Sequence, residues 1–296
     1  MEFVFETNGL TKRFDEVTAL DRVDLKIGRP SIVGLLGKNG SGKTTLINHL
    51  MGLQLPGEGS VTTLGRPSAE LGHDELIHIG YVPQEIRLLD WMTVEQHLHY
   101  VSCFYPKWDR EREKRLLDEL ELEASKPVGA LSTGNLQKLA VILAVCHHPH
   151  LLVLDEPVSD LDPIVREKLL AFLLELLRED EATILVSSHV LRDVEKVVDW
   201  VVCLDEGRVV TDSALDELKE RYSRWRVVSK NGDLPEIFSE PFVIGQEVSG
   251  REACLLVENG ASQIDAFRST YGAEIVERPL NLEEMFPVLV QKKSSC

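Results

Sequence analysis

Continuous apolar runs of strand length recur along the chain, at residues 31–36, 151–154 and 183–186. Strands of a parallel sheet are buried on both faces, so runs of this kind favour strands in such a sheet. Asp162 followed by Pro163 is typical of a helix start, and apolar residues then recur at helical spacing. This alternation of buried strands and amphipathic helices predicts an α/β domain with a mainly parallel sheet.

Helical patterns replace the strands between residues 85 and 130. Thr93 and Gln96 are spaced as a capping box, and the apolar residues that follow lie on one helical face. A segment of this length is too long for an ordinary connection between a strand and a helix. We therefore expect a helical subdomain, at about residues 85–145, inserted into the α/β core.

The pattern changes once more after Arg221, where short alternating or apolar segments follow one another. Turn signals such as Asn231-Gly232 separate these segments and indicate short strands joined by tight turns. We expect a main domain at residues 1–221 and a small α+β appendage at residues 222–296.

Charge and hydropathy exclude several classes of protein. The chain has 32 Lys and Arg against 49 Asp and Glu, a formal net charge of -17, which disfavours binding to nucleic acid or to anionic lipid. No apolar stretch approaches the roughly 18 to 20 residues that span a bilayer, and the first residues do not resemble a secretory signal. We expect a chain that stays inside the cell, with no nucleic acid partner.

Neither a disulfide framework nor a zinc site is indicated by the cysteines and histidines. The five cysteines are odd in number, far apart and without a C-x-x-C pair, which favours reduced thiols. The histidines at positions 147, 148 and 150 match no helix-face or zinc-finger spacing, and a solvated loop explains them better.

The strongest chemical signal is a glycine-rich segment between the first apolar run and a helical stretch. It fits the pattern G-x-x-x-x-G-K-[ST], in which backbone N–H groups and the positive end of a helix surround phosphate oxygens. We expect Lys43 to reach the β- and γ-phosphates of ATP and the Thr44 hydroxyl to bind Mg²⁺. The candidate nucleotide-binding residues here are Gly37, Lys38, Asn39, Gly40, Ser41, Gly42, Lys43, Thr44 and Thr45.

Two carboxylates end the second apolar run. Asp155 and Glu156 are adjacent, so their side chains leave the strand in different directions and can take different roles. We expect Asp155 to help hold Mg²⁺ and Glu156 to orient or deprotonate the attacking water.

In this setting the sequence resembles the nucleotide-binding subunit of ATP-binding-cassette (ABC) transporters. The ordered set of motifs spans about residues 10 to 212, and it adds four segments to the glycine-rich loop and the paired carboxylates. Residues 131–135 (LSTGN) resemble the family's signature motif, 81–84 (YVPQ) its Q-loop and 159–162 (SDLD) its D-loop, and His189 resembles its switch histidine. Thr133, Asn135 and Asp160 depart from the commoner pattern.

The resemblance implies roles for the remaining site residues. Phe14 occupies the place of the aromatic that stacks on adenine. Ser132 and Gly134 would contact the phosphates of a nucleotide held by a second molecule, because the first glycine-rich loop already surrounds its own nucleotide. Gln84 would contact Mg²⁺ and the attacking water, and His189 would donate to the γ-phosphate.

Partners follow from the same resemblance. Two cassettes, identical or different, would dimerise around Mg-ATP and move a separate transmembrane permease, which would hold this chain at the cytoplasmic face of the cell membrane. Residues 104–109 and 279–286 are similar to bacterial single-cassette subunits of exporter-type systems, which favours export over uptake.

Other classes remain open at this point. A soluble ABC-type ATPase acting in translation or on DNA is one alternative, and a regulatory cassette is another. Co-purification with a membrane subunit, rather than with ribosomes or DNA, would discriminate between them.

Overall fold

The structure is a computed structural model that describes residues 3–28, 31–158 and 161–291. The described residues fall into two compact units, one within Met1–Asp212 and one within Ser213–Cys296. Each unit has its own sheets and its own apolar core.

Among the described residues, six strands form the central sheet, in the order β10-β9-β3-β8-β7-β6. Strands β3, β8, β7 and β6 are parallel to one another, and β9 is parallel to β3. Every residue of β3, β7 and β8 is buried, so the expectation of a mainly parallel, doubly covered sheet is confirmed. The strands are β3 Ile32–Leu36, β6 Ile79–Val82, β7 Leu151–Asp155, β8 Thr183–Ser188, β9 Trp200–Asp205 and β10 Arg208–Ala214.

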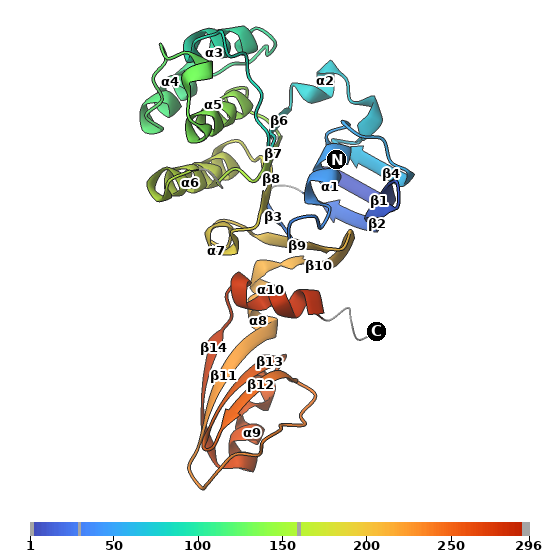
Figure 1. The fold of residues 1–296 in the computed structure, drawn as a ribbon, viewed down its shortest axis with the longest axis vertical. Helices are drawn as coiled ribbons and strands as arrows, with labels where there is room; N and C mark the ends of the chain where they lie inside the picture. Colours follow the sequence, from blue (N-terminus) through green and yellow to red (C-terminus); the bar gives the residue numbers. More distant parts are fainter. Residues whose placement is uncertain (1–2, 29–30, 159–160, 292–296) are drawn as a thin grey trace. The chain divides into compact units, whose positions relative to one another are not determined.

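Helices and a second sheet cover the two faces of the central sheet (Figure 1). Helices α5 (Thr133–Val145) and α6 (Pro163–Glu179) lie on one side, and α1 (Lys43–Leu50) lies on the other, together with an antiparallel sheet of order β2-β1-β4-β5. Buried aliphatic residues of α1, the antiparallel sheet and the central strands form one core. The antiparallel strands are β1 Phe5–Phe14, β2 Val17–Ile27, β4 Glu58–Thr63 and β5 Arg66–Pro67.

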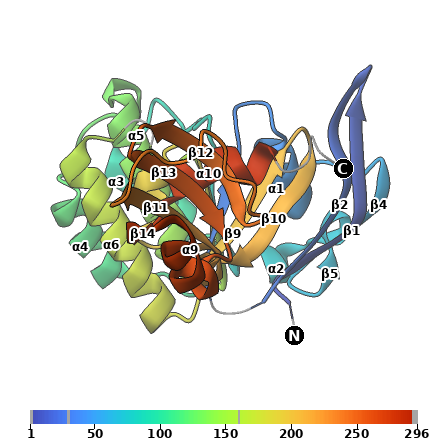
Figure 2. The ribbon, with the colours of Figure 1, turned by 90° about the horizontal axis from the view of Figure 1, so that it is seen from below.

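The expected insert is helical. Thr93 caps α3 through both capping-box hydrogen bonds, in which its side chain accepts from Gln96 N at 3.2 Å and its own N donates to Gln96 Oε1 at 2.9 Å. Helices α3 and α4 contact α5, which lies between them and α6 in Figure 1, and the turned view shows these four helices gathered on the side of the domain away from β1, β2 and β4 (Figure 2). The smaller elements of this unit, with the insert helices, are η1 Ser68–Glu70, α2 His73–Leu76, α3 Val94–Ser102, α4 Arg110–Glu119, η2 Val128–Ala130 and α7 Leu191–Val194.

Ion pairs join the insert to the core. The Arg112 guanidinium of α4 donates to both carboxylate oxygens of Asp180, the residue that ends α6, at 2.7 and 3.2 Å. His148 lies between Asp180 and Asp109, with its ring nitrogens 3.0 and 3.2 Å from their carboxylates. Burial of Asp180 opposes ionisation, but the hydrogen bonds from Arg112 and His148 outweigh it and lower the pKa of Asp180.

The second unit combines an antiparallel sheet with helices, and it begins at Ser213, whereas the sequence pattern placed the start of the appendage at residue 222. Its described strands form an antiparallel sheet of order β12-β13-β11-β14, and helix α9 contributes Phe267 to an aromatic core with Trp225 and Phe238. The elements are α8 Leu215–Arg221, β11 Tyr222–Ser229, β12 Val243–Ser249, β13 Glu252–Glu258, η3 Ala261–Gln263, α9 Ile264–Tyr271, β14 Ala273–Pro279 and α10 Leu282–Gln291.

Candidate functional site

The glycine-rich loop connects the end of β3 to the start of α1. Gly40 and Gly42 have φ of 80° and 107°, the left-handed region that favours glycine. A Cβ on Gly42 would lie 2.5 Å from the carbonyl oxygen of Ala19, so β2 also leaves no room for a side chain there. The loop conformation therefore favours glycine at position 42, which the motif specifies, and at position 40, which the motif leaves open.

The side chain of Lys43 is folded back across this loop. Only 7% of the residue is exposed, and its Nζ donates to the carbonyl oxygens of Gly37 at 2.8 Å and Lys38 at 3.3 Å. Nζ also lies 3.9 Å from Oε1 of Glu156. Burial lowers the pKa of Lys43, and the charges of Glu156 and Asp155 act in the opposite direction.

The expected partner residues Thr44 and Asp155 are in direct contact. Thr44 Oγ1 donates to Asp155 Oδ2 at 2.9 Å, although the two residues are far apart in the sequence. The other carboxylate oxygen, Oδ1, accepts from the hydroxyl of Ser187 on β8. Strand pairing places Ser187 beside Asp155, and no sequence motif indicated this serine.

Glu156 and His189 also come together. Nδ1 of His189 lies 2.7 Å from Oε2 of Glu156, and the Glu156 backbone N donates to Ser187 Oγ at 2.9 Å. Glu156 has a φ of 55°, which is uncommon for a residue with a side chain, and it is buried. Its carboxylate is thus held between Lys43 and His189 at the end of β7.

Lys43, Thr44, Asp155 and Glu156 border a hollow of about 610 Å³, whereas His189 does not line it. Gln84, which follows β6, lines it as expected, and so does Glu206, which the sequence reasoning did not identify. Glu206 lies in the turn between β9 and β10 and belongs to no motif, so only its position in space reveals it. The lining residues are Val17, Thr18, Ala19, Asn39, Gly40, Gly42, Lys43, Thr44, Thr45, Gln84, Asp155, Glu156 and Glu206.

Phe14 lies beside this hollow and does not line it. It ends β1 and pairs in register with Val17, which does line the hollow. Phe14 is 44% exposed, and Lys12 Nζ lies 5.5 Å from the centroid of its ring. Its role as a stacking aromatic stays a prediction.

The signature residues lie outside the hollow. Ser132 caps α5, where its hydroxyl accepts from Asn135 N at 3.3 Å, and Gly134 is in the first turn of that helix. Neither lines the hollow, and their role toward a second molecule stays a prediction. Of the expected D-loop, residues 159 and 160 lie outside the described part of the chain.

The chemistry of the donors fits a phosphate and a magnesium ion. The buried Ser41 hydroxyl has no hydrogen-bond partner within the described residues, so a donor is free in the glycine-rich loop. Thr44, Asp155 and Gln84 offer hydroxyl, carboxylate and amide oxygens, the ligand types that Mg²⁺ prefers. In the described ranges no cluster of three or more His, Cys, Asp or Glu could hold a metal. A magnesium ion here would therefore take further ligands from the nucleotide and water.

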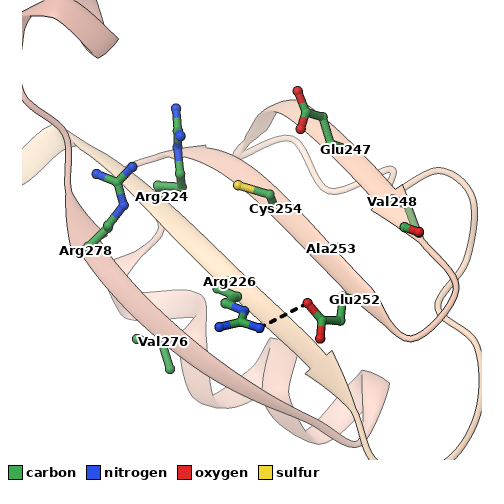
Figure 3. Close-up of a pocket in the computed structure, with 10 residues that line it drawn as sticks. Arg224, Arg226, Glu247, Val248, Glu252, Ala253, Cys254, Val276 and Arg278 are labelled. Atoms are coloured by element: carbon green, nitrogen blue, oxygen red, sulfur yellow. Dashed lines mark hydrogen bonds and ion pairs between the residues drawn. The ribbon is translucent and has the colours of Figure 1, made fainter.

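A second hollow, of about 510 Å³, lies on one face of the sheet of the C-terminal unit (Figure 3). Its arginines are already paired within the chain. Arg226 contacts Glu252 at 3.1 Å, and Arg224 and Arg278 both contact Glu284. These arginines therefore already have carboxylate partners in the chain.

Three features define the class of P-loop nucleotide-binding proteins. They are a parallel sheet, a glycine-rich loop that opens a helix after β3, and two carboxylates at the end of β7, which β8 separates from β3. A sequence model of the family described as ABC transporter matches residues 20–159. No helix in the described ranges is both long enough and apolar enough to cross a membrane.

Curated relatives agree with that family. The chain is 32% identical over 227 residues to the bacitracin transport ATP-binding protein BcrA of Enterococcus faecalis, covering 76% of this chain and 74% of BcrA. It is 33% identical over 281 residues to the uncharacterized ABC transporter ATP-binding protein YhaQ of Bacillus subtilis (strain 168), covering 93% of each. It is 29% identical over 291 residues to the Nod factor export ATP-binding protein I of Cupriavidus pinatubonensis, covering 96% of this chain and 89% of that protein.

A solved structure also supports membership of this family. An ATP-binding cassette captured as a dimer in a post-hydrolysis state with ADP and Pi superposes with a TM-score of 0.64 at 28% identity, covering 71% of this chain and 98% of that one. The chain therefore belongs to the ABC transporter family, as an ATP-binding subunit, and it is an ATPase of the kind that powers transport.

Proposed function

We propose that this chain hydrolyses Mg-ATP in the hollow at the ends of β3 and β7. One observation carries the proposal: the Glu156 carboxylate is held between Lys43 and His189, directly beside the hydrogen-bonded pair of Thr44 and Asp155. This arrangement places a cation, a candidate base and hard oxygen ligands at the end of the glycine-rich loop. A phosphoryl group and its attacking water need these three kinds of group together.

Each group has a distinct task. Lys43 binds the β- and γ-phosphates, and the backbone N–H groups from Lys38 to Thr45 surround their oxygens. Thr44, Asp155 and Gln84 hold Mg²⁺, which neutralises the charge that develops on the phosphate oxygens. Glu156 orients the attacking water or accepts its proton.

His189 and the signature residues complete the site. His189 fixes the Glu156 carboxylate and donates to the γ-phosphate, while Phe14 stacks on the adenine. Ser132 and Gly134 bind the nucleotide of a second cassette, either a copy of this chain or a different one. The exposed position of Ser132, away from its own hollow, supports a role toward a partner.

The mechanical output is the movement of a separate permease, and export is the proposed direction. A relative that covers almost the whole chain is named for Nod factor export. Dimerisation around ATP would move the helical insert, on which the permease rests, and this contact would keep the chain at the cytoplasmic face of the membrane.

Two substitutions test the site. Lys43→Ala removes the cation that meets the phosphates, so we expect ATP binding to fall at least about tenfold and turnover to be lost. Glu156→Gln keeps the shape of the side chain without a base, so we expect it to bind ATP, lose turnover by about a hundredfold or more and accumulate as a dimer. Equilibrium binding, phosphate release and size-exclusion chromatography with Mg-ATP measure these effects. Full turnover by Glu156→Gln would remove this carboxylate from its proposed role.

A further inference from the structure

Glu206 contributes a carboxylate to the hollow of the glycine-rich loop, whose other groups suit the negatively charged phosphates of a nucleotide. It lies in the turn between β9 and β10 and lines the same hollow as Lys43 and Thr44. Its side chain forms no hydrogen bond or ion pair within residues 3–28, 31–158 and 161–291. Near phosphate such a group is unfavourable, because like charges repel.

The turn that carries Glu206 is fixed on two sides of the hollow. The Gly207 N donates to Ser41 O of the glycine-rich loop at 3.0 Å, and the Gly207 O accepts from Asp21 N of β2 at 2.8 Å. The Arg208 Nε donates to the Asp21 carboxylate at 2.6 Å. Glu206 itself has a φ of 46°, so the turn holds it in an uncommon conformation.

The residues that line the hollow divide into those that suit phosphates and those that remain. Thr44 contacts Asp155 and Lys43 lies close to Glu156, which marks the place where the terminal phosphate belongs. Residues 17–19 of β2 and Glu206 also line the hollow, and Ala19 O lies close to both Gly42 and Gly207. Once the glycine-rich loop, Gln84, Asp155 and Glu156 are assigned to the phosphates and the metal ion, residues 17–19 and Glu206 are the lining residues left for the nucleoside.

We propose that Glu206 accepts hydrogen bonds from the ribose hydroxyls of the bound nucleotide. A carboxylate has two oxygens, which match two neighbouring hydroxyl donors, and charge-assisted hydrogen bonds of this kind are the stronger ones. Val17 and Ala19 offer an apolar surface for the base, which leaves the sugar for the carboxylate. This specificity role rests on the proposed function, because it requires a nucleotide in this hollow.

Binding of diphosphates to the full chain tests the contact without turnover. The probes are ADP, 2′-deoxy-ADP and 3′-deoxy-ADP, compared in the wild type and in Glu206→Ala. We expect each missing hydroxyl to weaken binding about fivefold in the wild type and to have almost no effect in Glu206→Ala. Asp205→Ala is the matched control, because it removes the neighbouring negative charge from a residue that does not line the hollow; it should keep the wild-type ratios.

Two further probes make the outcome decisive. Pyrophosphate has no ribose, so Glu206→Ala should bind it as tightly as the wild type or more tightly, while ADP binds less tightly. IDP lacks the 6-amino group of the base, and its affinity relative to ADP should be the same in both proteins. Deoxy-ADP ratios unchanged by Glu206→Ala, or a changed IDP ratio, would overturn the ribose contact. A wild-type chain that binds neither ADP nor ATP would instead overturn the proposed function.

Discussion

Ser187 shows how much of the site depends on a residue without a motif. Its hydroxyl donates to the Asp155 carboxylate and accepts from the backbone N of Glu156, so one side chain holds the first carboxylate and the backbone of the second at the end of β7. Ser187 is fully buried, and no solvent can replace these contacts without a change in structure. Its contribution is to position groups that contact the substrate.

We expect Ser187→Ala to lower kcat about tenfold and to change ADP affinity little, because the loop that binds phosphate is intact. Ser187→Thr keeps the hydroxyl and should restore most of the rate. Steady-state turnover and equilibrium ADP binding separate the two effects. A variant that loses ADP affinity and keeps its kcat would contradict a positioning role.

At the scale of elements, ion pairs that differ in burial join α4 to α6 and to Asp180, the residue that follows α6. Arg112 and Asp180 are 5% and 9% exposed at their side chains, whereas Arg115 and Glu175 are 41% and 30% exposed. Breaking a buried pair leaves a charge without its partner, while an exposed pair exchanges its contact for water. The buried pair therefore holds the insert against the core.

We expect Asp180→Ala to lower the free energy of unfolding by about 3 kcal/mol and Glu175→Ala by about 0.5 kcal/mol or less. The pKa of Asp180 is lowered by folding, so its contribution is present above the carboxyl's ordinary pKa of about 3.9 and is lost as the pH falls below it. Urea unfolding at neutral pH and near pH 3 measures both effects. If Asp180→Ala and Glu175→Ala lowered the free energy of unfolding equally, burial would not determine how much each ion pair stabilises the fold.

At the scale of the whole molecule, the site of one chain is proposed to need a second. Lys43 lines the hollow, whereas Ser132 and Gly134 begin α5 and do not line it. If Lys43 of one chain and Ser132 and Gly134 of another form one site, a chain changed at Lys43 and a chain changed at Ser132 and Gly134 can together form a dimer with one intact site.

We expect Lys43→Ala and the double variant Ser132→Ala, Gly134→Asp each to lose ATP turnover alone. When the two proteins are mixed, heterodimers contain one intact composite site, and about a quarter of the wild-type rate should return if dimers form at random and the sites act independently. Phosphate release from the mixture, against each protein at the same total concentration, measures this recovery. A mixture as inactive as its components would contradict a shared site between copies of this chain.

The local part of the structure was readable from the sequence. Apolar runs of strand length at residues 151–154 and 183–186 are buried strands, because a strand of a parallel sheet is covered on both faces. Thr93 caps its helix through contacts within one turn. The glycines of the loop before Lys43 are specified by backbone geometry, so their spacing alone predicted phosphate binding.

Tertiary structure decided what lies beside these local motifs. Strand pairing places Ser187 beside Asp155, and the hydrogen bond from Gly207 N to Ser41 O holds the turn that carries Glu206 against the glycine-rich loop. Phe14 pairs with Val17, which lines the hollow, but Phe14 itself does not line it. The position of Phe14 in the sequence could not show this. Sequence determines the contacts that a segment makes with itself, while side chains brought together by the packing of different strands carry no spacing that a single sequence displays.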